Sequence, residues 1–521
     1  MNTLTIDIKT RSCASIKTNG VFTYAQNKST QPICVTVKKN QDPPLVWLPP
    51  ELRRPEIITI SDDRLRQMIE EAEIIQAYDI TTEFALWKYT LRRLYPWFPE
   101  IPIRKLSCIA ARAAYLGMNF SLRNLMEELD IPDNELLFTP MDPIIFISPN
   151  KKITTETLSA LLKFCMNTVN AESCIAGKLI ELPPFEQQIW RSSLALNDNG
   201  IFISRESVGK RLENQKRSEE ALRDEFQAIT GLNNPMNGDG LLAYFNRRGI
   251  HLKNLEVESL EPVLRSMPDS RIRRVLEIRS HVAQNNPLRY SRLISLLGDD
   301  SRIRGLWEYH GNPSGTFRMK YLSEITDLNG FMAAEKNHIF RICRLPELRH
   351  QLFSVVMNGP DQTSIMTGRN LKEHCETAVN NPGKTVYYGK LKISCFSRFL
   401  KIVLPSERNV YLYKPEIKDK QLFCQLKYKR SILNKEISGS FLFHLLEEAM
   451  IRDTIMSYLI LLRKNHFTPV ITTPYEIVTE DPVSNELDES FQNVIANTPE
   501  WLSWYAFSPI VCLSKTWSSA S

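Results

Sequence analysis

The sequence predicts a mixed α/β protein of several domains, on the strength of three observations. The chain has 521 residues, which at about 150 residues per domain is enough for three or four domains. Apolar and polar residues alternate with period two before residue 48 and again after residue 384. Between these regions the apolar spacing is mainly helical. Strands at both ends of the chain and helices in the middle indicate the α+β class.

The first 180 residues are predicted to form strands and then helices. LTIDI, PICVTV and PLVWL have the composition and alternation of short strands. Helical patterns follow over residues 62–75 and 81–95, and then in SCIAARAAYLG and FSLRNLMEELD. Residues 137–152 are rich in proline and predict a loop, after which LSALLKFCMNTV resumes a helix.

The remaining residues are predicted to be helical first and extended later. Residues 204–229 form a long charged amphipathic pattern with Ser204 as a capping residue, and another helix is expected at about 269–285. Strands are expected in TVYYGKLKIS, FLKIVLP, NVYLY and LFCQLKY. A strong helix at about 440–464 then precedes a strand pair, TPVITT and YEIVTE.

The composition excludes some classes of protein. Apolar residues make up 43% and charged residues 24% of the chain, which argues against a disordered protein. No run of about 18 apolar residues occurs, and the start MNTLTIDIKT lacks the apolar region of an export signal, so a cytoplasmic protein without membrane spans is expected. The ten cysteines form no CxxC pair and are predicted to be reduced, mostly buried thiols rather than zinc ligands.

The positive charge is concentrated in one segment. Residues 265–304 hold nine arginines, no lysine and four acids, whereas the whole chain has a net charge of only +6. The planar guanidinium group presents paired donors to phosphate oxygens. The alternative is a solvated helix face on which Arg273 and Glu277 pair at i,i+4. Charge alone leaves both interpretations open.

The residues by themselves indicate no complete active site. Asp7 on the first strand and Glu83 near a helix start could be two ligands of a two-metal hydrolytic site, but Lys9 lies two residues after Asp7 on the same strand face. The turn cluster GLNNPMNGDG lacks the phosphate-loop motifs, and no GxSxG occurs. Tyr475 and Glu476 fall in an expected hairpin, where Glu476 has no second acid beside it.

Taken in order, several segments resemble the phage-type A-family DNA polymerases from residue 4 to about residue 517. LTIDIKT with GVFTYA, EEAEIIQAYDITTEFALW and FCMNTV resemble the three exonuclease motifs. LNNPMNGDGLLAYFNRRGIHL resembles the thumb, and LPSERNVYLYKPEI with PVITTPYEIVTEDP resembles the palm. The resemblance implies a ribonuclease-H-like α/β exonuclease-type domain, a helical thumb and a truncated antiparallel-sheet palm. The implied boundaries are 1–180 for the exonuclease-like domain, 181–330 for the thumb and primer-template region, 331–395 for a shortened palm/fingers connection and 396–521 for the palm remnant.

The chain departs from the family at the metal-binding positions. Asp7 is kept and Glu83 occupies the second acid position, but Lys9 and Thr168 replace the other two acids of the exonuclease motifs. The family uses Mg²⁺, and a lysine in place of a carboxylate disfavours a pair of such ions.

The polymerase half departs at more positions. Tyr475-Glu476 replaces the Asp-Glu pair of the third polymerase motif, Thr316 stands near an arginine position, and Glu407 replaces a glycine. Leu445 and Glu448 replace two polar residues of the palm helix, whereas Arg452 and Asp453 survive at its end. The first polymerase motif and the nucleotide-binding fingers helix cannot be found in the sequence. Too little chain separates the flanking matches to accommodate the fingers.

The resemblance and the departures together predict a homologue of DNA polymerases that has lost both activities and retains at most DNA binding, with no cofactor. The alternatives are a non-catalytic DNA- or protein-binding regulator and a decayed prophage remnant; residual single-metal cleavage by Asp7 and Glu83 is disfavoured by Lys9. A monomer is expected, with DNA as the partner of the thumb and no membrane or identified protein partner. The arginines assigned to DNA are Arg247, Arg248, Arg271, Arg274, Arg279, Arg289, Arg292, Arg302 and Arg304.

Overall fold

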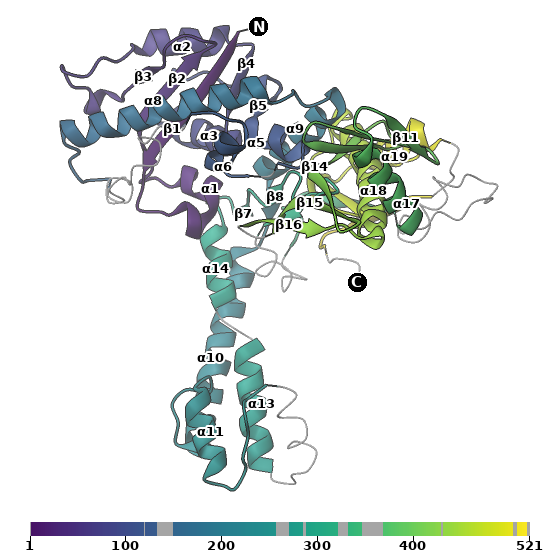
Figure 1. Cartoon of the computed structure of the whole chain (residues 1–521). Helices are drawn as coiled ribbons and strands as arrows, with labels where there is room; N and C mark the ends of the chain where they lie inside the picture. Colours follow the sequence, from purple (N-terminus) through teal and green to yellow (C-terminus); the bar gives the residue numbers. More distant parts are fainter. Residues whose placement is uncertain are drawn as a thin grey trace. The chain divides into compact units, whose positions relative to one another are not determined.

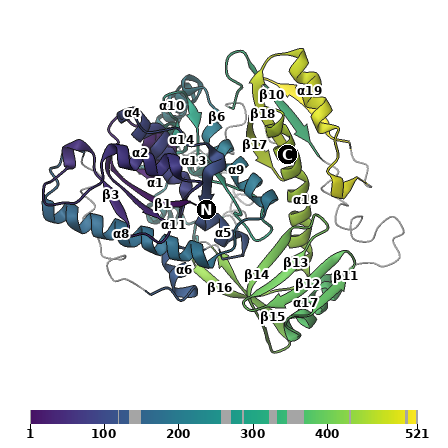
Figure 2. The same cartoon turned by 90° about the horizontal axis from the view of Figure 1, so that it is seen from above.

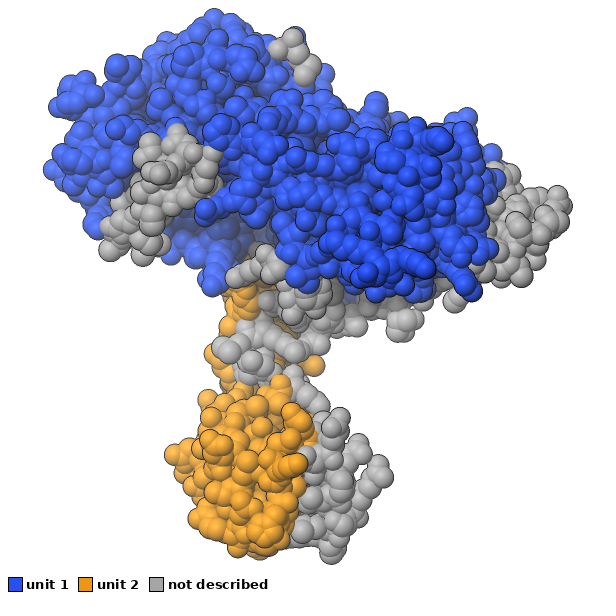
Figure 3. Space-filling view, in the orientation of Figure 1, with its two compact units in different colours: residues 1–202, 298–321, 332–521 blue, residues 203–297, 322–331 orange. Residues whose placement is uncertain are grey.

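The computed structural model describes residues 2–118, 120–132, 149–256, 270–284, 288–320, 332–345, 368–428, 431–503 and 508–517. The chain divides into two compact units (Figure 3). Unit 1 comprises residues 1–202, 298–321 and 332–521, and unit 2 comprises residues 203–297 and 322–331. The predicted mixed α/β architecture is confirmed. Within the described residues, no helix combines the length and apolar character needed to cross a membrane.

A five-stranded mixed sheet organises the amino-terminal part of unit 1. Its order is β3-β2-β1-β4-β5, with β1 antiparallel to β2 and parallel to β4. Helix α8 (Thr155–Lys178) packs on β1 and β2 (Figure 1). Its apolar side chains form a core with Ile33 and Val46. The strands are β1 (Thr3–Arg11), β2 (Gln31–Lys39), β3 (Leu45–Trp47), β4 (Ile74–Ala77) and β5 (Leu106–Cys108).

Two predictions in this region are wrong. The region before residue 48, expected to be extended, contains helix α1 (Ile16–Gln26), which is interrupted at Gly20. Its β-prone residues become helical because Phe22 and Tyr24 are buried and because Thr90 donates a hydrogen bond to the carbonyl of Ala25. The helix expected at 62–75 is α2 (Asp62–Glu71), and its predicted last turn is part of strand β4 instead.

The other helices of this part connect the sheet to the rest of unit 1. Helix α9 is capped by Gly200, whose φ of 65° ends the helix in a conformation that glycine adopts readily. Two short strand pairs follow in sequence, β6 (Ile201–Phe202) with β7 (Arg302–Ile303) and β8 (Trp307–Glu308) with β9 (Arg318–Met319). The helices are α3 (Ile80–Leu86), α4 (Arg92–Leu94), α5 (Ile109–Tyr115), α6 (Leu122–Glu128) and α9 (Pro184–Asn199).

A second, four-stranded sheet lies in the carboxyl-terminal part of unit 1 (Figure 2). Its order is β17-β18-β10-β19, and every neighbouring pair is antiparallel. Helix α18 (Gly439–Lys464) packs on β17 and β18, and α19 (Asn485–Ile495) packs on β10. The predicted long helix and the strand pair after it are confirmed. The strands are β10 (His338–Arg344), β17 (Pro469–Thr473), β18 (Glu476–Pro482) and β19 (Ile510–Ser514).

A six-stranded antiparallel meander precedes α18 and has helix α17 (Gly368–Asn380) on one face. The predicted strand TVYYGKLKIS is two strands, because the chain reverses at Gly389, whose φ is 56°. The other strands expected here are confirmed. The meander consists of β11 (Thr385–Tyr388), β12 (Leu391–Phe396), β13 (Phe399–Val403), β14 (Asn409–Lys418), β15 (Gln421–Tyr428) and β16 (Ser431–Glu436).

Unit 2 is helical, as its sequence predicts. Its core is built around Phe226, Tyr244, Phe245 and Val275, which are almost fully buried. The Asn237 side chain caps the amino terminus of the helix that carries Tyr244 and Phe245. The helices are α10 (Arg205–Thr230), α11 (Gly238–Asn246), α13 (Ser270–Gln284) and α14 (Leu288–Leu296).

The turn between β13 and β14 supports a first prediction. Glu407, at the position where the related family has glycine, has φ of 60°, a left-handed conformation that costs an L-residue about 1–2 kcal/mol. Glycine removes this cost, but its greater flexibility in the unfolded chain offsets part of the benefit. Glu407→Gly is therefore expected to raise the free energy of unfolding by about 0.5–1 kcal/mol. Urea denaturation measures the change. Glu436→Gly, on strand β16, is the control and is expected to be destabilising; a loss of stability in both variants would contradict the prediction.

Candidate functional site

Asp7 and Lys9 lie together on β1, as the strand alternation predicts. Asp7 is 3% exposed, and its Oδ1 accepts a hydrogen bond from Lys9 Nζ at 2.6 Å. The lysine ammonium also lies 5.7 Å from the centre of the Phe164 ring on α8. Burial alone would lower the pKa of Lys9, but the negative charge of Asp7 raises it above its ordinary value. The ammonium therefore remains charged and neutralises Asp7.

Glu83 on α3 approaches this pair, and Thr168 lies on α8, the helix that packs on β1. Glu83 is 9% exposed and faces the charges of both Asp7 and Lys9. Thr168 donates its hydroxyl hydrogen to the carbonyl of Phe164, at 2.9 Å, inside its own helix. The position that resembles a family aspartate thus holds a hydroxyl engaged with the helix backbone.

Sequence reasoning missed one acidic member of this group, Glu172. It follows Thr168 by one helical turn on α8, is 5% exposed, and interacts electrostatically with Asp7 and Lys9. Burial, together with the charge of Asp7, raises the pKa of both Glu83 and Glu172 well above the ordinary value. The i,i+4 spacing from Thr168 was the signal in the sequence that could have identified Glu172.

The residues present do not fit the pair of Mg²⁺ ions that the sequence resemblance implies for this group. Within the residues described, no three histidine, cysteine, aspartate or glutamate side chains converge closely enough to hold a metal ion. One oxygen of Asp7 already accepts from Lys9, and the raised pKa values favour protonated forms of Glu83 and Glu172. Protonated carboxyls are poor metal ligands.

The raised pKa of Glu172 leads to a second prediction, that Glu172→Gln stabilises the fold increasingly as the pH rises. The raised pKa favours the protonated carboxyl in the folded state, whereas the unfolded chain ionises it above about pH 4.3. Its contribution to stability is therefore present at low pH and is lost as the pH rises toward the folded pKa, at up to about 1.4 kcal/mol per pH unit. The glutamine has a similar shape and does not titrate.

Urea unfolding of the parent and the variant at pH 5 and pH 8 measures this effect. The gap in the free energy of unfolding between the two proteins should be larger at pH 8. The exposed Glu127→Gln on α6 serves as the control and should show the same gap at both pH values. A gap for Glu172→Gln that stays constant with pH would show that the carboxyl ionises alike in the folded and unfolded chains.

The second group of predicted residues lies at the β17–β18 hairpin. Glu476, the first residue of β18, is 4% exposed and pairs across the sheet with Arg344 at the end of β10. Its Oε2 accepts from Arg344 Nε at 2.6 Å, and its Oε1 accepts from the indole N–H of Trp517. Tyr475 joins the turn through its backbone, whose carbonyl accepts from the N–H of Leu345 at 2.8 Å.

At the turn of this hairpin, the carboxylate of Glu476 is therefore already neutralised by a guanidinium group. Arg344 was not singled out in the sequence, because its role depends on the pairing of β10 with β18. Much of the implied palm/fingers connection that follows β10, residues 346–367, lies outside the described residues.

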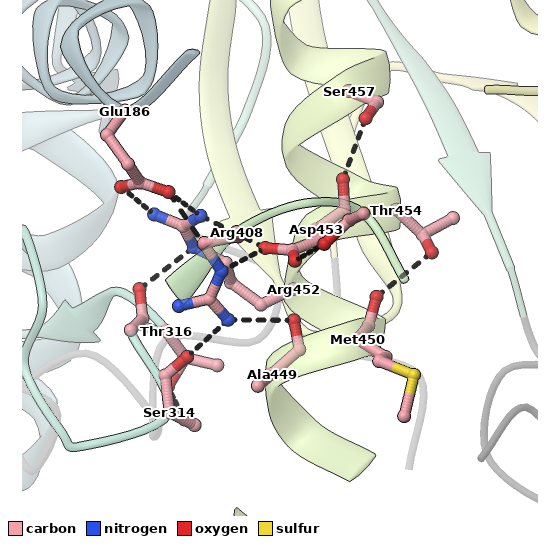
Figure 4. Close-up of polar contacts among 12 residues, drawn as sticks. Glu186, Ser314, Thr316, Arg408, Ala449, Met450, Arg452, Asp453, Thr454 and Ser457 are labelled. Atoms are coloured by element: carbon pink, nitrogen blue, oxygen red, sulfur yellow. Dashed lines mark hydrogen bonds and ion pairs between the residues drawn. The ribbon is translucent and has the colours of Figure 1, made fainter. Parts of the chain in front are cut away.

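The surviving Arg452 and Asp453 of α18 lie at the centre of a buried charged network (Figure 4). Arg452 donates to both oxygens of Glu186 on α9, at 2.5 and 2.7 Å, and to the carbonyl of Gly315 at 3.1 Å. Asp453 Oδ1 lies 2.6 Å from Nε of Arg408, which comes from the β13–β14 turn. Three segments distant in sequence are thus joined by two buried ion pairs, whose side chains belong to residues with exposed fractions between 0 and 4%.

The charges in this network fix its protonation states. Burial alone would raise the pKa of Glu186, but Arg452, a hydrogen bond with His310 and the charge of Arg408 hold it well below the ordinary value. Burial lowers the pKa of His310 to about 4, against the opposing attraction of Glu186. Tyr309 donates its hydroxyl hydrogen to Glu186 at 2.6 Å. The network is arranged as structural support, with its carboxylates held by guanidinium groups.

The arginines predicted to contact DNA are divided between the two units. Arg302 and Arg304 belong to unit 1, where Arg302 pairs with Glu335 and Glu480, and Arg304 pairs with Asp300. The other seven are residues of unit 2, among which the side chain of Arg289 lies outside the described residues.

Within unit 2 the arginines differ in their surroundings. Arg274 forms two hydrogen bonds to Glu225, at 2.7 and 2.8 Å, and Arg279 donates to the carbonyl of Pro235. Arg247 and Arg271 are exposed, and the exposed guanidinium of Arg248 lies 3.9 Å from the ring centre of Tyr244. Exposed arginines in one helical unit are compatible with phosphate contact.

Comparisons with known proteins support the resemblance to DNA polymerases. No family model matches the sequence. The chain is 22% identical over 327 residues to a DNA polymerase of Bacillus phage SP02. Its fold is similar to the polymerase domain of Pol1 from M. smegmatis, solved in complex with DNA primer-template and dNTP, with a TM-score of 0.54. The chain is a DNA polymerase A-family-like protein.

The two comparisons differ in how much they cover. The match to the phage polymerase covers 60% of this polymerase-like chain and 49% of the phage protein, so the chain spans about half the length of that relative. The structural match covers 94% of this chain and 93% of the Pol1 domain, at 10% sequence identity. The resemblance inferred from the ordered sequence segments is confirmed, and the fold extends it over nearly the whole chain.

Proposed function

We propose that this polymerase-like chain binds DNA and catalyses neither nucleotide transfer nor exonucleolytic cleavage. The observation that carries the proposal is that a cation neutralises the acid at each candidate metal site. Lys9 binds Asp7 at 2.6 Å, and Arg344 binds Glu476 at 2.6 Å. Phosphoryl transfer in polymerases depends on metal ions that neutralise developing charge, and a resident cation opposes their binding.

The proposed roles of the parts follow from the arrangement of the elements. The mixed β3-β2-β1-β4-β5 sheet supports a ribonuclease-H-like, exonuclease-type domain for residues 1–180. The helical unit 2 supports the thumb assignment, with boundaries inside the implied 181–330. The antiparallel β17-β18-β10-β19 sheet with α18 supports a palm, and the meander occupies the chain between β10 and α18.

DNA binding is the part of the proposal that a relative supports most directly. The Pol1 domain of similar fold was solved with primer-template DNA. The exposed arginines of unit 2 supply positive charge suited to the phosphate backbone. DNA is therefore the partner proposed for unit 2.

A primer-extension assay and a single-strand degradation assay, each with Mg²⁺ and with Mn²⁺, test the catalytic part. No template-directed incorporation and no shortening of the strand are expected, while duplex affinity measured by fluorescence anisotropy should fall with increasing salt. Incorporation that follows the template would overturn the proposal. Lys9→Glu combined with Thr168→Asp is the companion variant. If the parent degrades DNA and this variant does not, Lys9 would be part of a working site rather than a block.

A further inference from the structure

We propose that the outward face of strands β11–β13 is a binding site for single-stranded DNA, built from Tyr387, Lys392, Phe396 and Lys401. The inference rests on the proposed function only in taking DNA as the ligand. It concerns a surface different from the arginines of unit 2 and from both acidic sites.

The alternation of side chains defines this face. Leu391, Ile393 and Cys395 of β12 are buried on the side that faces α17, whose own buried residues include Leu371 and Cys375. The intervening residues of β12, Lys392 and Phe396 among them, consequently point to the opposite side. Neighbouring strands place Tyr387 directly across from Lys392, and Lys401 across from Ser394. The four side chains therefore share one face of three adjacent strands.

The aromatic side chains on this face are unusually exposed. Tyr387 is 68% exposed and Phe396 is 42% exposed. In the described parts of the chain, no other phenylalanine, tyrosine or tryptophan is classed as exposed. Phe396 lies four residues from Lys392 along β12, roughly 13 Å at 3.3 Å per residue, so the two rings can meet different bases.

The charge of the meander matches a polyanion. Residues 384–436 contain thirteen lysines and arginines and four acids, a net charge of +9, whereas the whole chain has +6. Lys392 is about half exposed, and the carboxylate of Glu407 lies 3.5 Å from its ammonium group in a solvent-exposed pair. Exposed pairs of this kind contribute little to stability, so a phosphate can take the place of the carboxylate.

These features favour a single strand over a duplex. Aromatic rings stack on bases with little dependence on sequence, and lysines follow the phosphates beside them. In a duplex the base faces are covered by neighbouring base pairs, and only the phosphates would remain to be bound. Loss of the aromatic rings should therefore weaken single-strand binding and leave duplex binding unchanged.

The experiment uses the full chain and fluorescence anisotropy with a labelled 20-nucleotide oligo-dT and, separately, a labelled 20-base-pair duplex. Tyr387→Ala with Phe396→Ala is expected to weaken oligo-dT binding about 100-fold, at about tenfold per stacked base, without changing duplex affinity. Lys392→Ala with Lys401→Ala is expected to reduce the slope of log K against log salt by about 1.4. The single variant Tyr387→Phe should retain the parent affinity.

The control is Lys28→Ala with Lys163→Ala, two exposed lysines outside the meander, which should bind oligo-dT like the parent. Circular dichroism melting checks that each variant is folded, and Tyr387→Ala alone replaces the double variant if that one fails. Parent-like oligo-dT affinity in the aromatic variants would overturn the inference, as would an equal loss in the control. If the inference is overturned in this way while the parent still binds the duplex, only this inference fails. If the parent binds neither oligo-dT nor the duplex, the proposed function fails as well.

Discussion

Replacing Arg452 by methionine is expected to lower the free energy of unfolding by about 3–5 kcal/mol. The guanidinium group is fully buried and holds both oxygens of Glu186, so its removal leaves a carboxylate buried without its main counter-charge. The loss should be largest near neutral pH. Because the folded pKa of Glu186 is depressed, its stabilising contribution is present above its ordinary pKa and disappears as the pH falls toward the folded value.

Urea denaturation at pH 7 and pH 4 measures this loss. Arg66→Met is the matched control, because Arg66 pairs with Glu70 on the surface of α2 at 2.8 Å, where solvent screens the two charges. Adding Glu186→Met to Arg452→Met should restore part of the stability, since the orphaned charge is then removed as well. A loss no greater than that of the surface control would show that the network carries little of the stability of unit 1.

Removing three exposed arginines of unit 2 is expected to have the largest effect on DNA binding. Arg247→Ala, Arg248→Ala and Arg271→Ala together should reduce the slope of log K against log salt for duplex DNA by about 2.7, since each phosphate contact contributes about 0.9. At 0.1 M salt this corresponds to an affinity about 10²–10³-fold lower. Arg274 is left in place, because its bond to Glu225 joins α13 to α10 and its loss would disturb the fold.

Fluorescence anisotropy over a range of salt concentrations measures the slope and the affinity together. The matched control removes three exposed arginines of unit 1, Arg64, Arg66 and Arg104. This control has the same change in net charge, so a comparable loss of affinity would mean that the protein attracts DNA through overall charge rather than through unit 2.

Secondary structure was predictable wherever the periodicity was long and uninterrupted. Helices α10, α13 and α18 and the strands of the β17–β18 hairpin fall where the sequence places them. The α1 segment and the β11–β12 hairpin were predicted wrongly. In both, local propensity favoured an extended strand, while burial of Phe22 and Tyr24 in one case and a reversal at Gly389 in the other decided the outcome.

The candidate sites were predictable in part. The proximity of Lys9 to Asp7 follows from strand alternation, and the structure shows the two in contact. Glu172 and Arg344 could not be found as easily, because their importance depends on which face of α8 meets β1 and on the pairing of β10 with β18. Glu186 forms its ion pair with Arg452, which lies 266 residues later in the sequence.

The sequence by itself determined the fold class and the resemblance to A-family polymerases, because composition, periodicity and ordered motifs are local properties of the chain. Tertiary structure alone decided which charges meet. A carboxylate becomes a metal ligand, a protonated acid or half of an ion pair according to the groups that long-range packing brings within a few ångströms of it and to the water that the same packing excludes.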